Sequence, residues 1–129
     1  MLLDTHVLVW AMLAPDHLSK RARDALVAAT ERCVSAASLY EITFKAMLGK
    51  WPEVSGLLAI DLEARLRADG FEIVAASGAI MKRAGRFDWA HRDPFDRIIV
   101  ATAMERALPV VSKDETLDAV PGGDVQRIW

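Results

Sequence analysis

Short apolar segments alternate with longer segments of helical spacing along this chain, and no other feature constrains its fold as strongly. The apolar segments lie at residues 2–3, 33–34, 71–74, 109–112 and 125–128. Parallel strands cannot be joined by tight turns, so strands that alternate with helices form a parallel sheet with helices on both faces. We therefore predict a single α/β domain over residues 1–129, with three layers (α/β/α) and a short parallel sheet of four to five strands flanked by helices.

The helical segments have clear start and stop signals. They are expected at residues 7–13, 19–29, 36–48, 53–68, 79–85 and 94–107, with a further helical turn at 114–117. Asp93 and Pro94 open the clearest of them, since aspartate is a favoured N-cap and proline a favoured first helical residue. Gly49 and Gly70 are placed to end two others.

Composition predicts a folded protein of the cytoplasm. Hydrophobic residues make up 53% of the chain and charged residues 26%, which argues against disorder. The single cysteine, Cys33, lies in an apolar run and is expected to be a buried, inert thiol. The first residues lack the pattern of a signal peptide, and no apolar run approaches the roughly 20 residues of a membrane span.

Four carboxylates follow predicted strands or lie in the first turns of the next helices. They are Asp4, Glu41, Asp96 and Asp114. In parallel sheets, functional groups gather beyond the carboxyl ends of the strands, where the strand order reverses. Carboxylates brought together there repel one another, so such a cluster usually holds a cation or shares protons. Ligands that are all oxygen favour Mg²⁺ or Mn²⁺ over Zn²⁺.

Each acid also has a structural interpretation that the sequence leaves open. Glu41 is the fourth residue of a capping-box pattern that begins at Ser38. Asp96 lies in the first turn of a helix, where the helix dipole stabilises any acid. Asp114 and Asp4 are placed to be N-caps of the helical segments that follow them.

Four segments of the sequence resemble one known family. They are residues 2–10 (LLDTHVLVW), 38–42 (SLYEI), 91–101 (HRDPFDRIIVA) and 111–114 (VSKD). In these segments, and in their order along the chain, the protein is similar to the PIN-domain ribonucleases. The likeness is greatest to the VapC-type toxins of bacterial toxin–antitoxin pairs. The DPFDR block at residues 93–97 is the most specific of these segments.

The resemblance implies a complete acidic quartet that holds Mg²⁺, with Mn²⁺ as a substitute. Asp4 and Asp96 are expected to bind the ion directly, and Glu41 and Asp114 directly or through water. The implied activity is endonucleolytic hydrolysis of RNA phosphodiester bonds. The formal net charge of −2 shows no basic excess for RNA, but a bound metal would supply positive charge locally.

Three further residues are predicted to support this site. Thr5 and Ser112 match small hydroxyl positions that support the metal or its waters in the family, although turn and cap hydrogen bonds explain them equally well. Arg97, beside Asp96, is expected to contact the scissile phosphate or to form an ion pair with the quartet. Asp93 is interpreted as a helix N-cap and not as a ligand.

Other basic and aromatic residues receive no catalytic role. They are Lys45, Lys50, Arg92, Trp10, Trp51, Trp89, His6, His17 and His91. The basic residues are candidates for contacts with the RNA backbone, but scattered charges are typical of a solvated surface. The tryptophans fit core or interface positions better than base stacking. The histidines lack the spacing of metal ligands.

The resemblance also implies partners. A homodimer is expected, together with a small antitoxin whose peptide wraps the toxin and covers the acidic site. RNA is the expected substrate, and its identity stays open among transfer, ribosomal and messenger RNA. In the family the antitoxin supplies the contact with DNA, so this chain alone is not expected to bind DNA.

Three other functions fit the sequence less well. A haloacid-dehalogenase-like phosphatase requires a second aspartate two positions after the first, where this chain has His6. A receiver-like signalling domain requires paired acids before its phospho-accepting aspartate, a pattern that Lys113 alone does not satisfy. A non-catalytic PIN-fold scaffold remains the alternative to an enzyme, and an incomplete quartet would favour it.

Overall fold

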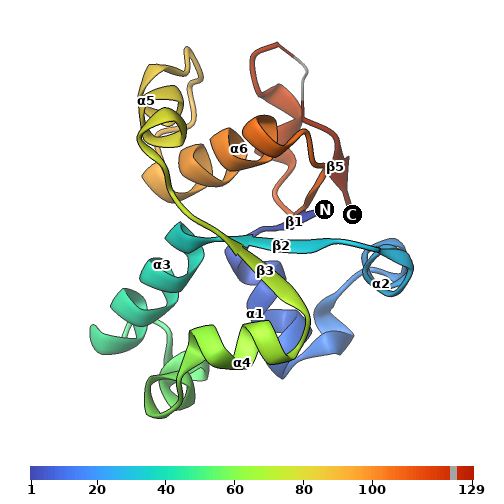
Figure 1. Ribbon diagram of the computed structural model, residues 1–129, viewed down its shortest axis with the longest axis vertical. Coiled ribbons are helices and arrows are strands. Elements are labelled where there is room, and N and C mark those ends of the chain that lie inside the picture. The colour runs from blue at the N-terminus through green and yellow to red at the C-terminus, as the bar shows by residue number, and fades with distance from the viewer. Residues whose placement is uncertain (123–124) are drawn as a thin grey trace.

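A computed structural model describes residues 1–122 and 125–129 (Figure 1). Its centre is one sheet of five parallel strands in the order β3-β2-β1-β4-β5. The strands are β1 (Leu2–Leu3), β2 (Arg32–Ser35), β3 (Phe71–Val74), β4 (Val110–Val111) and β5 (Arg127–Ile128). The predicted parallel sheet of four to five strands is thus confirmed.

Helices cover both faces of the sheet, which confirms the three-layer α/β/α architecture. The α-helices are α1 (Thr5–Leu13), α2 (Lys20–Ala28), α3 (Ala36–Met47), α4 (Leu62–Ala68), α5 (Gly78–Arg86) and α6 (Pro94–Arg106). The 3₁₀ helices are η1 (Pro15–His17), η2 (Pro52–Ala59) and η3 (Glu115–Ala119). In Figure 1, α5 and α6 lie above the sheet, and α1, α3 and α4 lie below it. Within the described residues, no helix combines the length and the apolar character needed to cross a bilayer.

The short strands supply both hydrophobic cores, because successive side chains of a strand point to opposite faces. One residue of each inner strand packs into the core beneath α5 and α6, and the next residue packs into the core against α1, α3 and α4. The pairs are Leu2 and Leu3, Cys33 and Val34, and Val110 and Val111. All six residues are 0% exposed, so two residues from each inner strand join the sheet to both helical layers.

The predicted helix over residues 53–68 is wrong, because the chain forms two shorter elements there. The 3₁₀ helix η2 ends at Ala59, and Ile60 is extended. The Asp61 carboxylate then accepts a hydrogen bond from the backbone N–H of Ala64 at 3.0 Å and caps a new helix, α4. A polar cap in the middle of the apolar pattern therefore divides the segment.

The order of the strands fixes where a site can form. β1 pairs with β2 on one side and with β4 on the other, so the strand order reverses at the boundary between β1 and β4. Leu3 is in register with Val111. The residues directly after these two strands, Asp4 and Ser112, therefore lie side by side at the carboxyl edge of the sheet.

The opposite, amino-terminal edge holds the buried Cys33, as predicted. Its thiol donates to Glu31 Oε1 at 3.4 Å, and burial raises the pKa of this thiol to about 11. The neighbouring acids Glu31 and Glu72 both pair with the Arg106 guanidinium, at 3.0 and 2.7 Å. Arginine thus neutralises the acids of this edge, and the thiol stays protonated at neutral pH.

Replacement of the core residue Leu66 tests the packing of α4. Leu66 is the buried residue of α4 and is 0% exposed. Truncation to alanine leaves a cavity, so Leu66→Ala is expected to lower the free energy of unfolding by about 2–5 kcal/mol. Urea denaturation measures this change. Val27→Ala, at a side chain that is 88% exposed, is the control and should change it by less than about 0.5 kcal/mol. Equal stabilities would contradict the packing described.

Candidate metal centre

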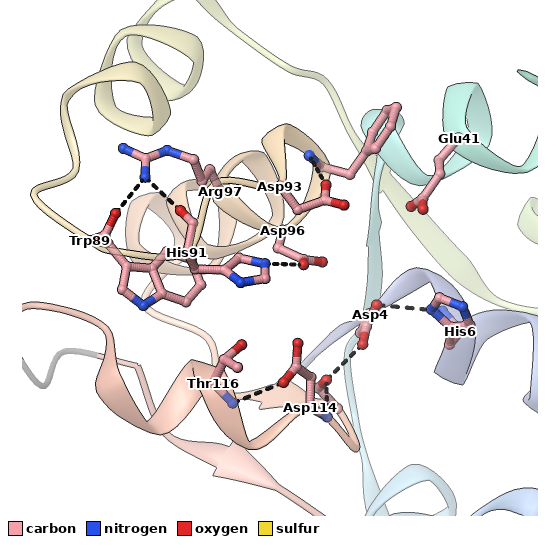
Figure 2. A network of polar contacts seen from close by, with 12 residues as sticks. Asp4, His6, Glu41, Trp89, His91, Asp93, Asp96, Arg97, Asp114 and Thr116 are labelled. Carbon is pink, nitrogen blue, oxygen red and sulfur yellow. Dashed lines mark hydrogen bonds and ion pairs between the residues drawn. The ribbon is translucent and has the colours of Figure 1, made fainter.

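A cavity of about 280 Å³ lies at the carboxyl edge of the sheet. The four acids selected from the sequence all line it, although they come from distant parts of the chain. The lining residues are Asp4, His6, Trp10, Glu41, Lys45, Asp93, Asp96, Lys113 and Asp114. Figure 2 shows the carboxylates of this cavity turned toward a common space. The fold therefore brings the predicted quartet together.

Asp4 is the most buried aspartate of this cavity, with 8% of its surface exposed. It leaves β1 and caps α1, where its Oδ1 accepts from the backbone N–H of His6 at 3.4 Å. Its Oδ2 accepts from the Ser112 hydroxyl at 2.6 Å. Burial raises the pKa of Asp4, and the negative charge of Glu41 adds a smaller rise. The hydrogen bond from Ser112 and the nearby His6 lower this pKa in part. The hydroxyl of Ser112 thus holds a carboxylate whose burial is costly.

Asp96 lies in the first turn of α6, and its Oδ2 is 2.5 Å from Nε2 of His91. Burial raises the pKa of Asp96 to about 6, and the charges of Asp4 and Asp93 add to the rise, while His91 opposes it. Burial, with a smaller contribution from the neighbouring acids, therefore disfavours the ionised form of Asp96.

Asp114 and Ser112 form a short turn after β4. The Ser112 hydroxyl accepts from the backbone N–H of Asp114 at 3.0 Å while it donates to Asp4. The Asp114 Oδ1 accepts from the backbone N–H of Thr116 at 2.9 Å, which makes Asp114 the N-cap of η3. The N-cap interpretation of Asp114 is thus confirmed, and the same residue also lines the cavity.

Glu41 reaches the cavity from α3 and is 4% exposed. Its Oε1 is 2.5 Å from Nζ of Lys45, one turn along the helix. The capping-box interpretation of Glu41 is wrong, because α3 begins at Ala36 and Ser35 is its N-cap. Ser38 instead accepts a hydrogen bond from the Thr5 hydroxyl at 3.0 Å, which ties α1 to α3 inside the protein. Thr5 thus holds together α1 and α3, which both contribute residues to the cavity lining.

His91 is the site residue that the sequence did not reveal. One ligand atom each of His91, Asp96 and Asp114 lies within 4.8 Å of the others, a group compact enough to hold a metal ion. His91 lies in the loop before α6, so it does not show the spacing of two metal ligands on one helix. The sequence signal for a role of His91 was its position at the start of the block HRDPFD, five residues before Asp96.

Arg97 holds the loop that carries His91. Its Nε donates to the carbonyl of Ala84 at 2.9 Å, and Nη1 donates to the carbonyls of Trp89 and His91 at 3.1 and 2.9 Å. Its Nη2 donates to the carbonyl of Phe87. Both roles predicted for Arg97 required its donors to face the cavity, and the structure turns them toward the loop instead. Among the described residues it forms no ion pair with the quartet.

Comparison with known proteins places the chain in a family. The family model for the PIN domain matches residues 1–123. The chain belongs to the PIN domain family. Ribonuclease VapC22 from Mycobacterium tuberculosis is 32% identical over 120 residues, which covers 90% of this PIN protein and 88% of that one. The resemblance read from the sequence is thus confirmed.

Solved structures show the same fold. VapBC2 from Rickettsia felis, bound to a DNA fragment from its promoter, superposes with a TM-score of 0.68 at 15% identity, covering 98% of this chain and 95% of that one. A toxin–antitoxin complex from Klebsiella pneumoniae gives a TM-score of 0.60 at 21% identity, covering 95% and 92%. Both chains therefore share the PIN fold described above.

Neutralising Asp96 tests the electrostatic description of the cavity. Its pKa in the folded protein, about 6, exceeds the ordinary 3.8, so the folded state binds a proton more tightly than the unfolded state. In EDTA, the free energy of unfolding should therefore fall as pH rises from about 4 to 7. Asp96→Asn should flatten this fall and raise the free energy of unfolding at pH 7.5 by about 1–2 kcal/mol, since solvent screens the partly exposed carboxylate.

Asp118 provides the matched control, measured by urea denaturation at the same pH values. Its hydrogen bond from Arg127 lowers the pKa of Asp118, so ionisation of this group favours the folded state. Asp118→Asn should therefore give no increase in stability at pH 7.5. A change of stability in the same direction in Asp96→Asn and Asp118→Asn would contradict a destabilising charge on Asp96.

Proposed function

We propose that this PIN-family protein is a Mg²⁺-dependent endoribonuclease and the toxin of a toxin–antitoxin pair. The observation that carries the proposal is the cavity in which Asp4, Glu41, Asp96 and Asp114 face one another. The name of the related ribonuclease VapC22 supports the choice of RNA as substrate.

The residues present fit a hard divalent cation. Carboxylate oxygens are the ligands that Mg²⁺ and Mn²⁺ prefer, and the acids of the cavity repel one another in its absence. Asp4 and Asp96 are the proposed direct ligands, with Glu41 and Asp114 completing the set directly or through water. When bound, the cation would stabilise the charge that builds on the phosphoryl oxygens and acidify the attacking water.

The chain's own residues position these groups. The Ser112 hydroxyl donates to one carboxylate oxygen of Asp4 and accepts from the backbone N–H of Asp114. These two hydrogen bonds hold Asp4 and Asp114 in place after the neighbouring strands β1 and β4. The contact between His91 Nε2 and Asp96 Oδ2, at 2.5 Å, holds the carboxylate of Asp96. Lys45 places a positive charge beside Glu41 at the cavity wall, where it offsets part of the negative charge that would repel an RNA phosphate.

Two partners are proposed besides RNA. The Klebsiella pneumoniae neighbour is a toxin–antitoxin complex, which supports a small antitoxin that covers the acidic cavity of this protein. A homodimer is supported by exposed hydrophobic side chains on and after α3. They are Tyr40, Phe44, Met47 and Leu48, from 46% to 71% exposed. We propose that the antitoxin supplies the contact with DNA.

Cleavage of a mixed pool of structured RNAs tests the proposed activity. The purified, antitoxin-free protein is expected to cut RNA with Mg²⁺ and not with EDTA. The double variant Asp4→Asn, Asp96→Asn should lose at least about 100-fold in rate, because both proposed metal ligands lose their charge. Asp24→Asn, an exposed surface acid paired with Lys20, is the control and should retain full activity.

Each outcome has a defined meaning. Metal-dependent products that the double variant loses would establish the nuclease and assign its site. Cleavage that persists in EDTA, or in the double variant, would contradict the proposed site. Absence of cleavage across the pool would favour the non-catalytic PIN-fold scaffold.

A further inference from the structure

The described residues include two compact groups of potential metal ligands. In each group, one ligand atom from each of three residues lies within 4.8 Å of the other two. Each group combines two carboxylates with one ligand of another kind. The groups are His91, Asp96 and Asp114 at the carboxyl edge of the sheet, and Glu31, Cys33 and Glu72 at the amino-terminal edge. Their surroundings decide which of them can take up an ion.

The group at the amino-terminal edge is already neutralised. The Arg106 guanidinium pairs with Glu31 at 3.0 Å and with Glu72 at 2.7 Å. Cys33 is 0% exposed, and its thiol donates a hydrogen bond to Glu31. A cation could bind here only if it displaced the guanidinium and removed a buried proton. This group is therefore a structural network.

The group at the carboxyl edge has no such neutralising partner. Within the described residues, the only ion pair of Asp96 is with His91, and Asp114 has none. Asp114 Oδ1 accepts from the backbone N–H of Thr116 at 2.9 Å, and Asp96 Oδ2 lies 2.5 Å from His91 Nε2. The second oxygen of each carboxylate accepts no hydrogen bond from the part of the chain described. Each acid thus keeps lone pairs that a cation can use beside an imidazole nitrogen.

The fold holds the imidazole of His91 beside these acids. Arg97 donates to the backbone carbonyls of Trp89 and His91, at 3.1 and 2.9 Å. Trp89 is 8% exposed and belongs to the core under α6, and its ring lies against the His91 ring with centroids 4.8 Å apart. Figure 2 shows the His91 imidazole directed at Asp96. The loop backbone and a core ring therefore orient this imidazole before any ion binds.

The group lies between two hollows of the surface. Asp96 and Asp114 line the acidic cavity, whereas His91 and Thr116 line a second hollow of about 340 Å³. The side chains of His91 and Asp96 are both 24% exposed. An ion held by this group would therefore be reachable from solvent and would border the acidic cavity.

The spacing of the three ligand atoms suits one small divalent ion. Nitrogen and oxygen ligands lie about 2.0–2.2 Å from such an ion, so ligand atoms that share it are about 3–4 Å apart. Small side-chain rotations are enough to reach this spacing. The kind of ligand then determines the preferred ion, because Mg²⁺ prefers oxygen ligands and imidazole nitrogen suits transition metals.

We propose that His91, Asp96 and Asp114 bind a divalent transition-metal ion through one imidazole nitrogen and two carboxylate oxygens. The neutral imidazole binds through the lone pair of Nε2 and keeps its proton on Nδ1, so coordination to a shared ion replaces its hydrogen bond with Asp96. The site therefore binds such an ion more tightly than Mg²⁺. This inference rests on the proposed metal-dependent function and specifies a further ligand and the class of metal.

Metal binding measured without RNA tests this assignment. Untagged protein is titrated by calorimetry with Co²⁺ and, separately, with Mg²⁺. The unaltered protein is expected to bind Co²⁺ at least about tenfold more tightly than Mg²⁺. His91→Ala should weaken Co²⁺ binding by roughly tenfold or more and Mg²⁺ binding by less than about threefold, because only the nitrogen ligand is lost.

Proton NMR of the protein with one equivalent of Co²⁺ identifies the ligand directly. A coordinated imidazole gives a hyperfine-shifted resonance from its remaining ring N–H, which disappears on exchange into D₂O. This resonance is expected in the unaltered protein and not in His91→Ala. His6→Ala is the matched control and should keep the resonance, because His6 also lines the acidic cavity but its ring lies against Trp51, with centroids 4.6 Å apart.

A second variant separates coordination from simple positioning of Asp96. His91→Gln keeps a side chain that can donate a hydrogen bond to Asp96 but lacks a nitrogen lone pair. It should lose the preference for Co²⁺ as His91→Ala does. Circular dichroism verifies folding, and Arg97 binds only backbone carbonyls of the loop, which both substitutions leave in place.

The results separate the two proposals. Equal affinity for Co²⁺ and Mg²⁺, or a Co²⁺ preference and a shifted resonance that persist in folded His91→Ala or His91→Gln, overturns the role of His91 as a ligand. If the unaltered protein still cleaves RNA with Mg²⁺ in that case, the ribonuclease function stands with carboxylate ligands alone. If the unaltered protein binds neither ion, both proposals fail.

Discussion

Burial of carboxylates beside one another is the constraint on which the site depends. Charged groups so placed favour the neutral form or a bound cation. Burial is the largest cause of the raised pKa of both Asp4 and Asp96, and neighbouring acids add to it. A chain without a use for this arrangement would gain stability from less acidic residues. This cost agrees with the proposal that the cavity is a metal site.

Three sets of hydrogen bonds position the residues of the cavity. Ser112 joins the turns after β1 and β4 through Asp4 and the Asp114 backbone. The Thr5 and Ser38 hydroxyls join α1 to α3. Arg97 binds four backbone carbonyls and so positions the loop that brings His91 to Asp96. The parallel sheet makes these contacts possible, because it places the carboxyl ends of its strands at one edge.

The sequence predicted the architecture well because strand and helix alternation is a local pattern. Position and family resemblance selected four acids that the fold brings to one cavity. The sequence did not predict the role of Arg97, since backbone carbonyls of a loop leave no trace in side-chain patterns. It assigned His91 no role, because the loop conformation that brings this ring to Asp96 does not follow from residue spacing. It merged η2 with α4 because apolar spacing continues across Asp61. Contacts that depend on loop conformation are therefore the part that sequence patterns did not reveal.

Calorimetric titration with Mn²⁺ tests most directly the central claim that the crowded carboxylates hold a divalent cation. Binding requires ionised carboxylates, and the pKa of Asp96 is about 6 in the metal-free protein. We expect Mn²⁺ to bind at pH 7.5, to bind roughly tenfold more weakly at pH 5, and not to bind to the Asp4→Asn, Asp96→Asn variant. Affinity that is equal at both pH values, or that survives in the double variant, would contradict this claim.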